Sequence, residues 1–268
     1  MADSTETRKE RRATARAERD RAAEAAQARR RQRLWILGGV LALAVVVVAI
    51  IAIAAGGGSN NKPVKRQGEI LPGQVETNAR FAGIPQRGLV VGNPRAPVTL
   101  VEFADLQCPF CRDYTINVMP SLVDRYVRPG KLRMEFRNVS FIGNDSLRAA
   151  QMAAAAGLQN KLWQFADLFY NNQGEENSGY VTDPFLQKIG SAVRGLDVQR
   201  AMNERNLPSI QRQLTDAQTE WQADGFNGTP SFLVGPTTGR QVAVLRQGVG
   251  PTVQNMSKAI DQALAQAR

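Results

Sequence analysis

The chain contains only two cysteines, and two residues separate them in Cys108-Pro-Phe-Cys111. A thiol pair at this spacing can cycle between a dithiol and a disulfide. A structural disulfide is a second interpretation, but it would close a loop of about four residues, worth roughly 2 kcal/mol on the chain-entropy model. A metal site is a third, but tetrahedral zinc needs further Cys or His ligands, and the sequence has no histidine. We therefore favour redox chemistry.

The residues around the pair predict a strand that leads into a helix. Val98–Phe103 is apolar and rich in β-branched side chains, as in a buried strand. Pro109 suits the first helical position, which makes Cys108 the N-cap. The free N–H groups and the dipole of a helix N-terminus favour an anion there. We expect Cys108 to have a lowered pKa and to be the attacking sulfur, with Cys111 resolving the mixed disulfide.

Two segments, in this order, resemble one family. Residues 102–111, Glu-Phe-Ala-Asp-Leu-Gln-Cys-Pro-Phe-Cys, resemble the active-site signature of the DsbA-like thiol–disulfide oxidoreductases, which belong to the thioredoxin superfamily. Residues 228–234, Gly-Thr-Pro-Ser-Phe-Leu-Val, resemble the loop and strand that carry this family's cis-proline. The chain is identified as a membrane-anchored bacterial member, and the resemblance covers residues 88–268. It implies an enzyme whose redox-active cysteine pair carries the electrons, with no other cofactor and no metal.

The resemblance also implies roles for three further residues. The Thr229–Pro230 bond would be cis and would face the cysteines, and the backbone of Thr229 could pair with an extended substrate segment. Glu102, six residues before Cys108, would be a buried proton acceptor near Cys111 with a pKa raised by desolvation. The alternative is that Glu102 points to a solvated strand end. Asp105 is expected only to cap the loop before the helix.

Phe110 departs from the pattern of the best-known oxidising member, which has histidine at this position. Pro109 and Phe110 would tune the motif, but Cys108 must rely on the helix dipole and backbone N–H groups alone. Strong oxidising power is therefore not implied. The absence of histidine from the chain also excludes Ser–His and Cys–His hydrolase mechanisms.

The N-terminal part of the chain predicts a membrane anchor. Residues 1–33 hold eleven Lys/Arg and six Asp/Glu, which predicts a basic cytoplasmic tail able to contact anionic lipid. No aromatic residue is interleaved there, so no specific nucleic-acid binding is expected. Residues 34–55 carry no charge and would span about 33 Å as a transmembrane helix. The positive-inside rule places the N-terminus in the cytoplasm and the cysteines outside.

A cleaved signal peptide is the alternative, with a cleavage site at residues 52–54. A retained signal-anchor is favoured, because the apolar cores of signal peptides usually run only about 7–15 residues. Both interpretations export the cysteines to a compartment where disulfides persist. Residues 56–87 begin with a Gly-rich run and predict a flexible extracytoplasmic linker whose later part could pack on the domain.

Residues 88–268 are of the size of one domain. Hydrophobic patterns and breakers predict strands at 89–91, 98–103, 132–136, 231–234 and 241–245, a helix at 109–127 kinked at Pro120, and helices at 145–158, 161–170, from 182, 197–206, 210–224 and 252–267. The pattern alone indicates a mixed α/β domain. With the resemblance, it indicates a thioredoxin fold with an all-helical insertion at about 143–224, preceded by a single transmembrane helix.

The expected function is a membrane-anchored, extracytoplasmic thiol–disulfide oxidoreductase that introduces disulfides into exported proteins. The resemblance implies a quinone-linked membrane partner that reoxidises Cys108 and Cys111. A reductase or isomerase is the near alternative, since the sequence does not fix the direction of electron flow. Two more distant alternatives are a non-catalytic membrane-tethered binding module and a protein whose basic tail carries the function.

Overall fold

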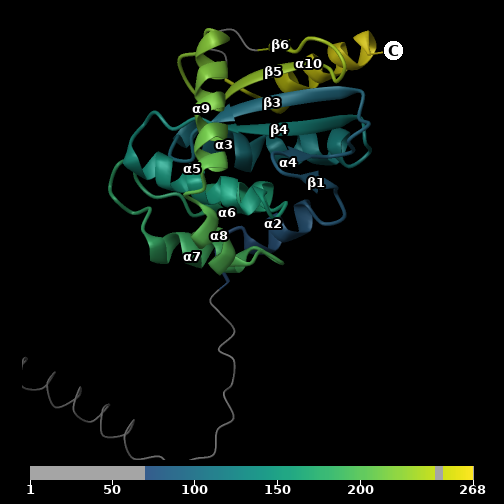
Figure 1. Cartoon of the computed structure of the whole chain (residues 1–268). Coiled ribbons are helices and arrows are strands. Elements are labelled where there is room, and N and C mark those ends of the chain that lie inside the picture. The colour runs from purple at the N-terminus through teal and green to yellow at the C-terminus, as the bar shows by residue number, and fades with distance from the viewer. Residues whose placement is uncertain (1–69, 245–249, 268) are drawn as a thin grey trace, which may run out of the picture. The chain divides into compact units, whose positions relative to one another are not determined.

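The computed structural model describes residues 70–244 and 250–267 (Figure 1). The chain divides into two compact units, Met1–Gln67 and Gly68–Arg268, and the description concerns the second. The expected tail, transmembrane helix and first part of the linker lie outside the described residues. Within these two ranges, no helix is both long enough and apolar enough to span a bilayer.

A six-stranded mixed sheet forms the centre of the domain, in the order β1-β2-β4-β3-β5-β6. The strands are β1 (Gln86–Arg87), β2 (Val90–Val91), β3 (Val98–Ala104), β4 (Leu132–Asn138), β5 (Ser231–Pro236) and β6 (Val242–Ala243). β3 pairs in parallel with β4 and antiparallel with β5. The predicted strand that precedes the cysteines is therefore an inner strand of the sheet.

Every residue of β3 is buried, because helices cover both faces of the sheet (Figure 1). Val101 and Phe103 point to one face, where they pack with Trp221 of α9 (Pro208–Ala223). Leu100 and Ala104 point to the other, into the main core. The C-terminal helix α10 (Val253–Gln266) contacts β3 and β5.

The connection from β3 to β4 is a broken helix. The sequence predicts one helix over 109–127 with a kink at Pro120, and the structure has α3 (Pro109–Asn117), α4 (Met119–Leu122) and the π-helix η1 (Val123–Val127). The break falls at Val118, two residues earlier than expected. Pro120 cannot donate a backbone hydrogen bond, so it is accommodated in the first turn of a new helix.

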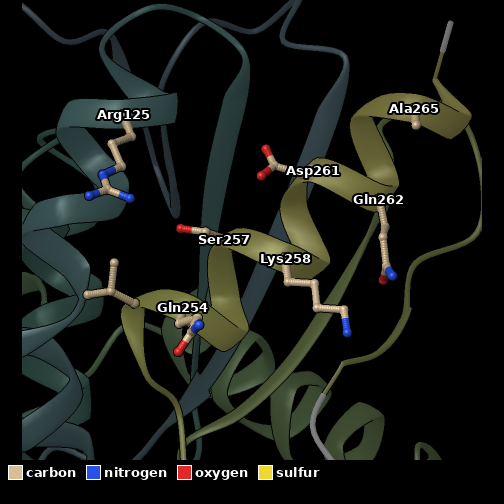
Figure 2. A pocket seen from close by; sticks show the side chains of 8 residues that line it. Arg125, Gln254, Ser257, Lys258, Asp261, Gln262 and Ala265 are labelled. Carbon is tan, nitrogen blue, oxygen red and sulfur yellow. The ribbon is translucent and has the colours of Figure 1, made fainter.

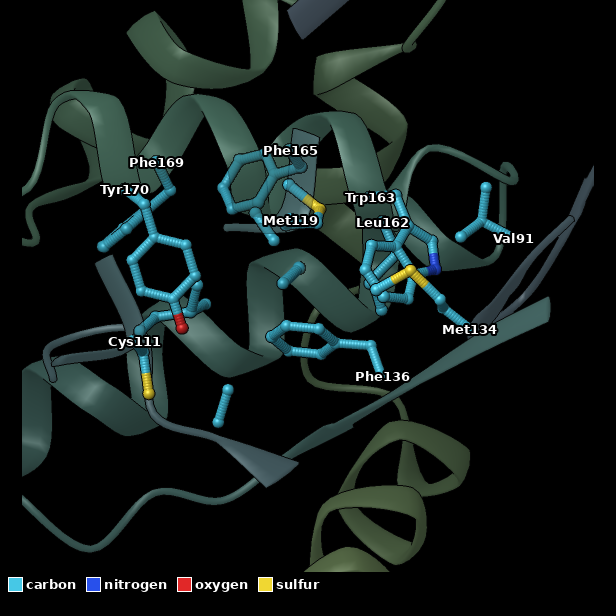
Figure 3. Packing of buried hydrophobic residues seen from close by; sticks show 14 of the residues in the cluster. Val91, Cys111, Met119, Met134, Phe136, Leu162, Trp163, Phe165, Phe169 and Tyr170 are labelled. Carbon is cyan, nitrogen blue, oxygen red and sulfur yellow. The ribbon is translucent and has the colours of Figure 1, made fainter. Parts of the chain in front are cut away.

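The predicted helical insertion is present as five helices. These are α5 (Asn144–Gly157), α6 (Leu162–Asn171), α7 (Asp183–Ala192), α8 (Val198–Glu204) and α9. α6 is the inner helix of this layer, and its Trp163 ring packs edge-on against the Phe136 ring of β4 (Figure 3). Residues 162–170 are all buried, whereas the sequence pattern predicted a helix with a single apolar face.

The expected linker over 56–87 is too long at its C-terminal end. The helix α2 (Gln74–Arg80) and strand β1 lie within it, and both belong to the folded unit. Arg80 and the buried hydroxyl of Thr77 bind the carboxylate of Asp167 on α6. A buried carboxylate requires such partners, so this ion pair ties α2 to the insertion.

Candidate active site

The two cysteines lie where β3 leads into α3, as the sequence predicted. Cys108 is the N-cap of α3 and Pro109 occupies the first turn. Both cysteines are free thiols and both are buried, so the structure describes the dithiol form. Phe110, between them, is 72% exposed. The aromatic ring between the two cysteines in the sequence therefore projects into solvent.

The surroundings of Cys108 favour its thiolate. Together they lower the pKa of Cys108 to about 6, and the hydrogen bond from the Cys111 thiol is the main cause. Thr229 and the backbone N–H groups of Cys111 and Phe110 act in the same direction, whereas burial opposes them. When protonated, the Cys108 thiol donates to the Thr229 carbonyl oxygen at 3.3 Å. The backbone N–H groups that the sequence analysis anticipated therefore contribute, but the main donor is the Cys111 thiol, which it did not anticipate.

Cys111 has the opposite environment, because its sulfur is completely buried. Desolvation raises the pKa of Cys111 well above its usual value, and the neighbouring Cys108 and Glu102 raise it further. The two thiols therefore differ in the direction that an attacking and a resolving cysteine require. To react, the Cys111 thiol must pass its proton to another group.

Glu102 is the candidate for proton exchange with the Cys111 thiol. Its side chain is buried, so it does not lie at a solvated strand end. Burial raises the pKa of Glu102 to about 8, and its Oε1 atom has no hydrogen-bond partner among the described residues. A carboxyl group that is neutral near pH 7 and close enough to influence Cys111 can exchange a proton with it.

The loop before β5 completes the site from a distant part of the sequence. The Thr229–Pro230 peptide bond is cis. Phe103 of β3 pairs with Ser231, the first residue of β5, so the loop lies at the same sheet edge as the cysteines. Its Gly228 carbonyl oxygen accepts hydrogen bonds from the Trp221 indole and the Ser231 hydroxyl. The sequence-predicted residues from 102–111 and 229–230 therefore come together.

Asp105 has a larger part than the capping role expected for it. One oxygen of its buried carboxylate accepts from the Gln107 N–H, and the other accepts from the N–H groups of Phe141 and Ile142. It therefore joins the turn before Cys108 to the segment that follows β4. Burial raises the pKa of Asp105, and these hydrogen bonds oppose that shift.

Two residues of the insertion were not singled out in the sequence, yet they hold the active-site turn. The Gln173 amide donates to the carbonyl oxygens of Leu106 and Cys108. The Tyr170 hydroxyl donates to the Asp105 carbonyl oxygen, and the Arg112 guanidinium donates to the Tyr170 carbonyl oxygen. Their partners are backbone atoms, so no side-chain motif in the sequence indicates these contacts.

A cavity of about 840 Å³ lies elsewhere in the domain, between η1 and α10 (Figure 2). Arg125, Ser257, Lys258 and Asp261 line it together with apolar and amide side chains. None of its lining residues belongs to the group around Cys108. The redox chemistry is therefore not located in this hollow.

Comparisons with known proteins agree with this geometry. The thioredoxin family profile matches residues 86–261. The "Probable disulfide bond formation protein D" of Bacillus cereus is 30% identical over 190 residues, which cover 70% of this chain and 82% of the relative. The oxidised crystal structure of BdbD from Bacillus subtilis has a TM-score of 0.58 at 20% identity and covers 68% of this chain and 97% of its own. The crystal structure of alpha-DsbA1 from Wolbachia pipientis has a TM-score of 0.56 at 21% identity and covers 67% of this chain and 92% of its own.

A buried dithiol at a helix start, within a thioredoxin fold that carries a helical insertion, defines the class of thiol–disulfide oxidoreductases. Within this class, the chain belongs to the DsbA-like family. It is a protein thiol–disulfide oxidoreductase, which confirms the family and the activity expected from the two sequence segments. The interpretation as a non-catalytic binding module is not retained.

Proposed function

We propose that the chain introduces disulfides into exported proteins through Cys108 and Cys111. A substrate thiolate attacks the Cys108 sulfur of the oxidised pair, and the Cys111 thiolate leaves. The second substrate thiolate then attacks the substrate sulfur of the mixed disulfide and releases Cys108. The substrate loses two electrons and two protons, and the enzyme retains the electrons as a dithiol. A membrane partner linked to quinone reoxidises that dithiol, and the sulfurs need no further cofactor.

The remaining site residues take roles around this exchange. The ionised fraction of Glu102 accepts the proton of Cys111 when the pair is reoxidised, and the protonated carboxyl group returns a proton when Cys111 leaves as a thiolate. Thr229 and Pro230 present the backbone edge on which an extended substrate segment can pair. The exposed ring of Phe110 is an apolar contact for that segment and, with Pro109, sets the conformation between the sulfurs.

The position of Cys108 at the start of α3, among donors that lower its pKa, supports oxidation as the direction. A stabilised thiolate favours the dithiol over the disulfide, and thereby makes the disulfide a better electron acceptor. Thioredoxin, with a nucleophile pKa of about 7, has a potential near −270 mV, and DsbA, with about 3.5, has one near −120 mV. A pKa of about 6 for Cys108 predicts a value between these two.

The reduction potential of Cys108–Cys111, measured by equilibration in glutathione buffers, tests this proposal. We expect a potential clearly above that of thioredoxin, together with oxidation of a reduced, unfolded substrate protein by stoichiometric enzyme. A potential at or below about −270 mV would instead make the chain a reductase or isomerase, the alternative that the absence of histidine beside Cys108 favours. A Cys108→Ser variant serves as the inactive control.

We further propose that residues 34–55 anchor the chain as a single-pass signal-anchor, with residues 1–33 in the cytoplasm and the catalytic domain outside. The support is the uncharged 22-residue run and the basic residues that precede it. In intact cells, a membrane-impermeant thiol reagent should label the reduced cysteines. Extraction at alkaline pH should leave the full-length chain with the membrane. Release of a shortened chain would instead indicate a cleaved signal peptide.

A further inference from the structure

A second cavity, of about 320 Å³, lies between the segment that follows α2, the start of α6 and the end of α7. Gln86, Lys161, Gln164 and Arg194 are among its lining residues. None of the residues around it takes part in the thiol chemistry described above. Its size is at the lower end of small-molecule sites, which corresponds to a compact ligand.

Two glutamines that line it each have a buried amide oxygen without a hydrogen-bond partner among the described residues. Gln164 is only 6% exposed, and its Oε1 atom accepts no hydrogen bond within the described part of the chain. The Oε1 atom of Gln86 is also buried and without a donor there. Buried polar atoms in native proteins are normally satisfied, so these two acceptors call for donors that the described residues do not supply.

Positive charge lies beside these acceptors. Lys161 and Arg194 both line the cavity, and neither side chain forms an ion pair with any residue in 70–244 or 250–267. Lys161 is also the N-cap of α6, a ten-residue helix whose first turn has no side-chain cap. The N–H groups of that turn and the helix dipole therefore add to the attraction for an anion.

We propose that this cavity binds a phosphate ester of a small polyol. The phosphate group would contact Lys161, Arg194 and the start of α6, and the hydroxyl groups would donate to Gln164 and Gln86. Free glycerol phosphate and the headgroup of phosphatidylglycerol share this chemistry. The site is separate from the cysteines, so the proposal does not depend on the direction of the redox reaction.

Calorimetric titration of the full-length chain in a neutral detergent tests the proposal. The probes are sn-glycerol 3-phosphate, inorganic phosphate and dihexanoyl phosphatidylglycerol, with dihexanoyl phosphatidylcholine as the control. We expect saturable binding of a phosphoglycerol probe that is tighter than that of inorganic phosphate. Binding of the free ester identifies a soluble ligand, and binding of the lipid alone identifies a headgroup. Absence of saturable binding by both, or equal binding of inorganic phosphate, would overturn the proposal.

Variants locate the bound probe. Lys161→Gln, Arg194→Gln and Gln164→Leu should each raise the dissociation constant about tenfold, because each removes one charge-assisted or buried hydrogen bond. Lys258→Gln changes an exposed lysine of the other cavity (Figure 2) and should leave it unchanged. Arg194 is exposed, so its variant is informative even if Gln164→Leu fails to fold. Unchanged affinity in Lys161→Gln and Arg194→Gln would place the ligand elsewhere.

Discussion

The two sulfurs of the active site, three positions apart in one chain, have opposite electrostatic surroundings. Cys108 lies among N–H and thiol donors at the start of α3, whereas Cys111 lies inside the core. Burial disfavours a thiolate, and hydrogen-bond donors favour it. The pair therefore consists of one nucleophilic thiolate, Cys108, and one protonated thiol, Cys111. The division requires no histidine, because the Cys111 thiol and the N–H groups at the start of α3 supply the donors.

This difference predicts selective alkylation of the reduced enzyme. With a pKa of about 6, roughly 90% of Cys108 is thiolate at pH 7, whereas Cys111 stays protonated. Iodoacetamide should therefore modify Cys108 first, and the rate should rise as the pH passes through 6. Peptide mass spectrometry after short exposures measures both sites. Equal rates at the two cysteines would contradict the assigned activation.

Glu102 predicts a pH-dependent loss of stability. Its pKa is raised in the folded state from 4.5 to about 8, so the folded protein keeps a proton that the unfolded chain releases. The stability from this group is fully present below pH 4.5 and is lost as the pH rises towards 8. Glu102→Gln removes the titration and should stabilise the dithiol form at pH 7 by up to about 3 kcal/mol.

Urea unfolding of both proteins at pH 5 and pH 7.5 measures this effect. The wild-type stability should fall relative to that of Glu102→Gln between the two pH values. The same substitution should slow reoxidation of the pair, because glutamine cannot ionise to the carboxylate that accepts the Cys111 proton. A parallel pH dependence in both proteins would mean that Glu102 is ionised when folded.

At the scale of elements, the ion pair between α2 and α6 illustrates how a polar residue can belong to a core. Asp167 is 1% exposed and has Arg80 and Thr77 as its partners. Removal of one partner from a buried pair typically costs about 3–5 kcal/mol. Arg80→Ala should therefore destabilise the domain by several kcal/mol in chemical denaturation.

A second ion pair provides the matched control. Arg200 and Glu204 of α8 pair across one helical turn, but the arginine is more than half exposed. Arg200→Ala should cost only about 0.5 kcal/mol, because solvent screens the pair. If the two substitutions have similar effects, α2 is not tied to the insertion by this contact.

The elements that carry the chemistry were predictable, and those that support it were less so. Strand β3, the start of α3 and the loop at Pro230 follow from an apolar run, a proline and a family resemblance. The helix α2 was taken for linker, since Gln-Val-Glu-Thr-Asn-Ala-Arg has no apolar stripe. It folds because its polar side chains meet Asp167, and such pairings across about 90 positions leave no local pattern.

At the scale of the whole molecule, the folded unit extends further towards the N-terminus than the resemblance does. A chain that begins at Gly68 should unfold cooperatively with the stability of the full-length domain. One that begins at Gly88 lacks α2 and β1 and leaves the Asp167 carboxylate unpaired inside the protein. The free energy of unfolding of this shorter chain should fall by several kcal/mol, or the chain should fail to fold. Thermal unfolding followed by circular dichroism compares the two chains. Equal midpoints would mean that residues 68–87 belong to the linker and not to the folded unit.

The four hydrogen bonds from Arg112, Tyr170 and Gln173 join the active-site turn and α3 to the last turn of α6 and the loop that follows it. The insertion is therefore not a module that evolution could exchange freely. A substitution at the end of α6 would therefore also alter the geometry of the cysteines. Two lineages with the same Cys-Pro-Phe-Cys motif could consequently diverge in redox behaviour through residues about sixty positions away.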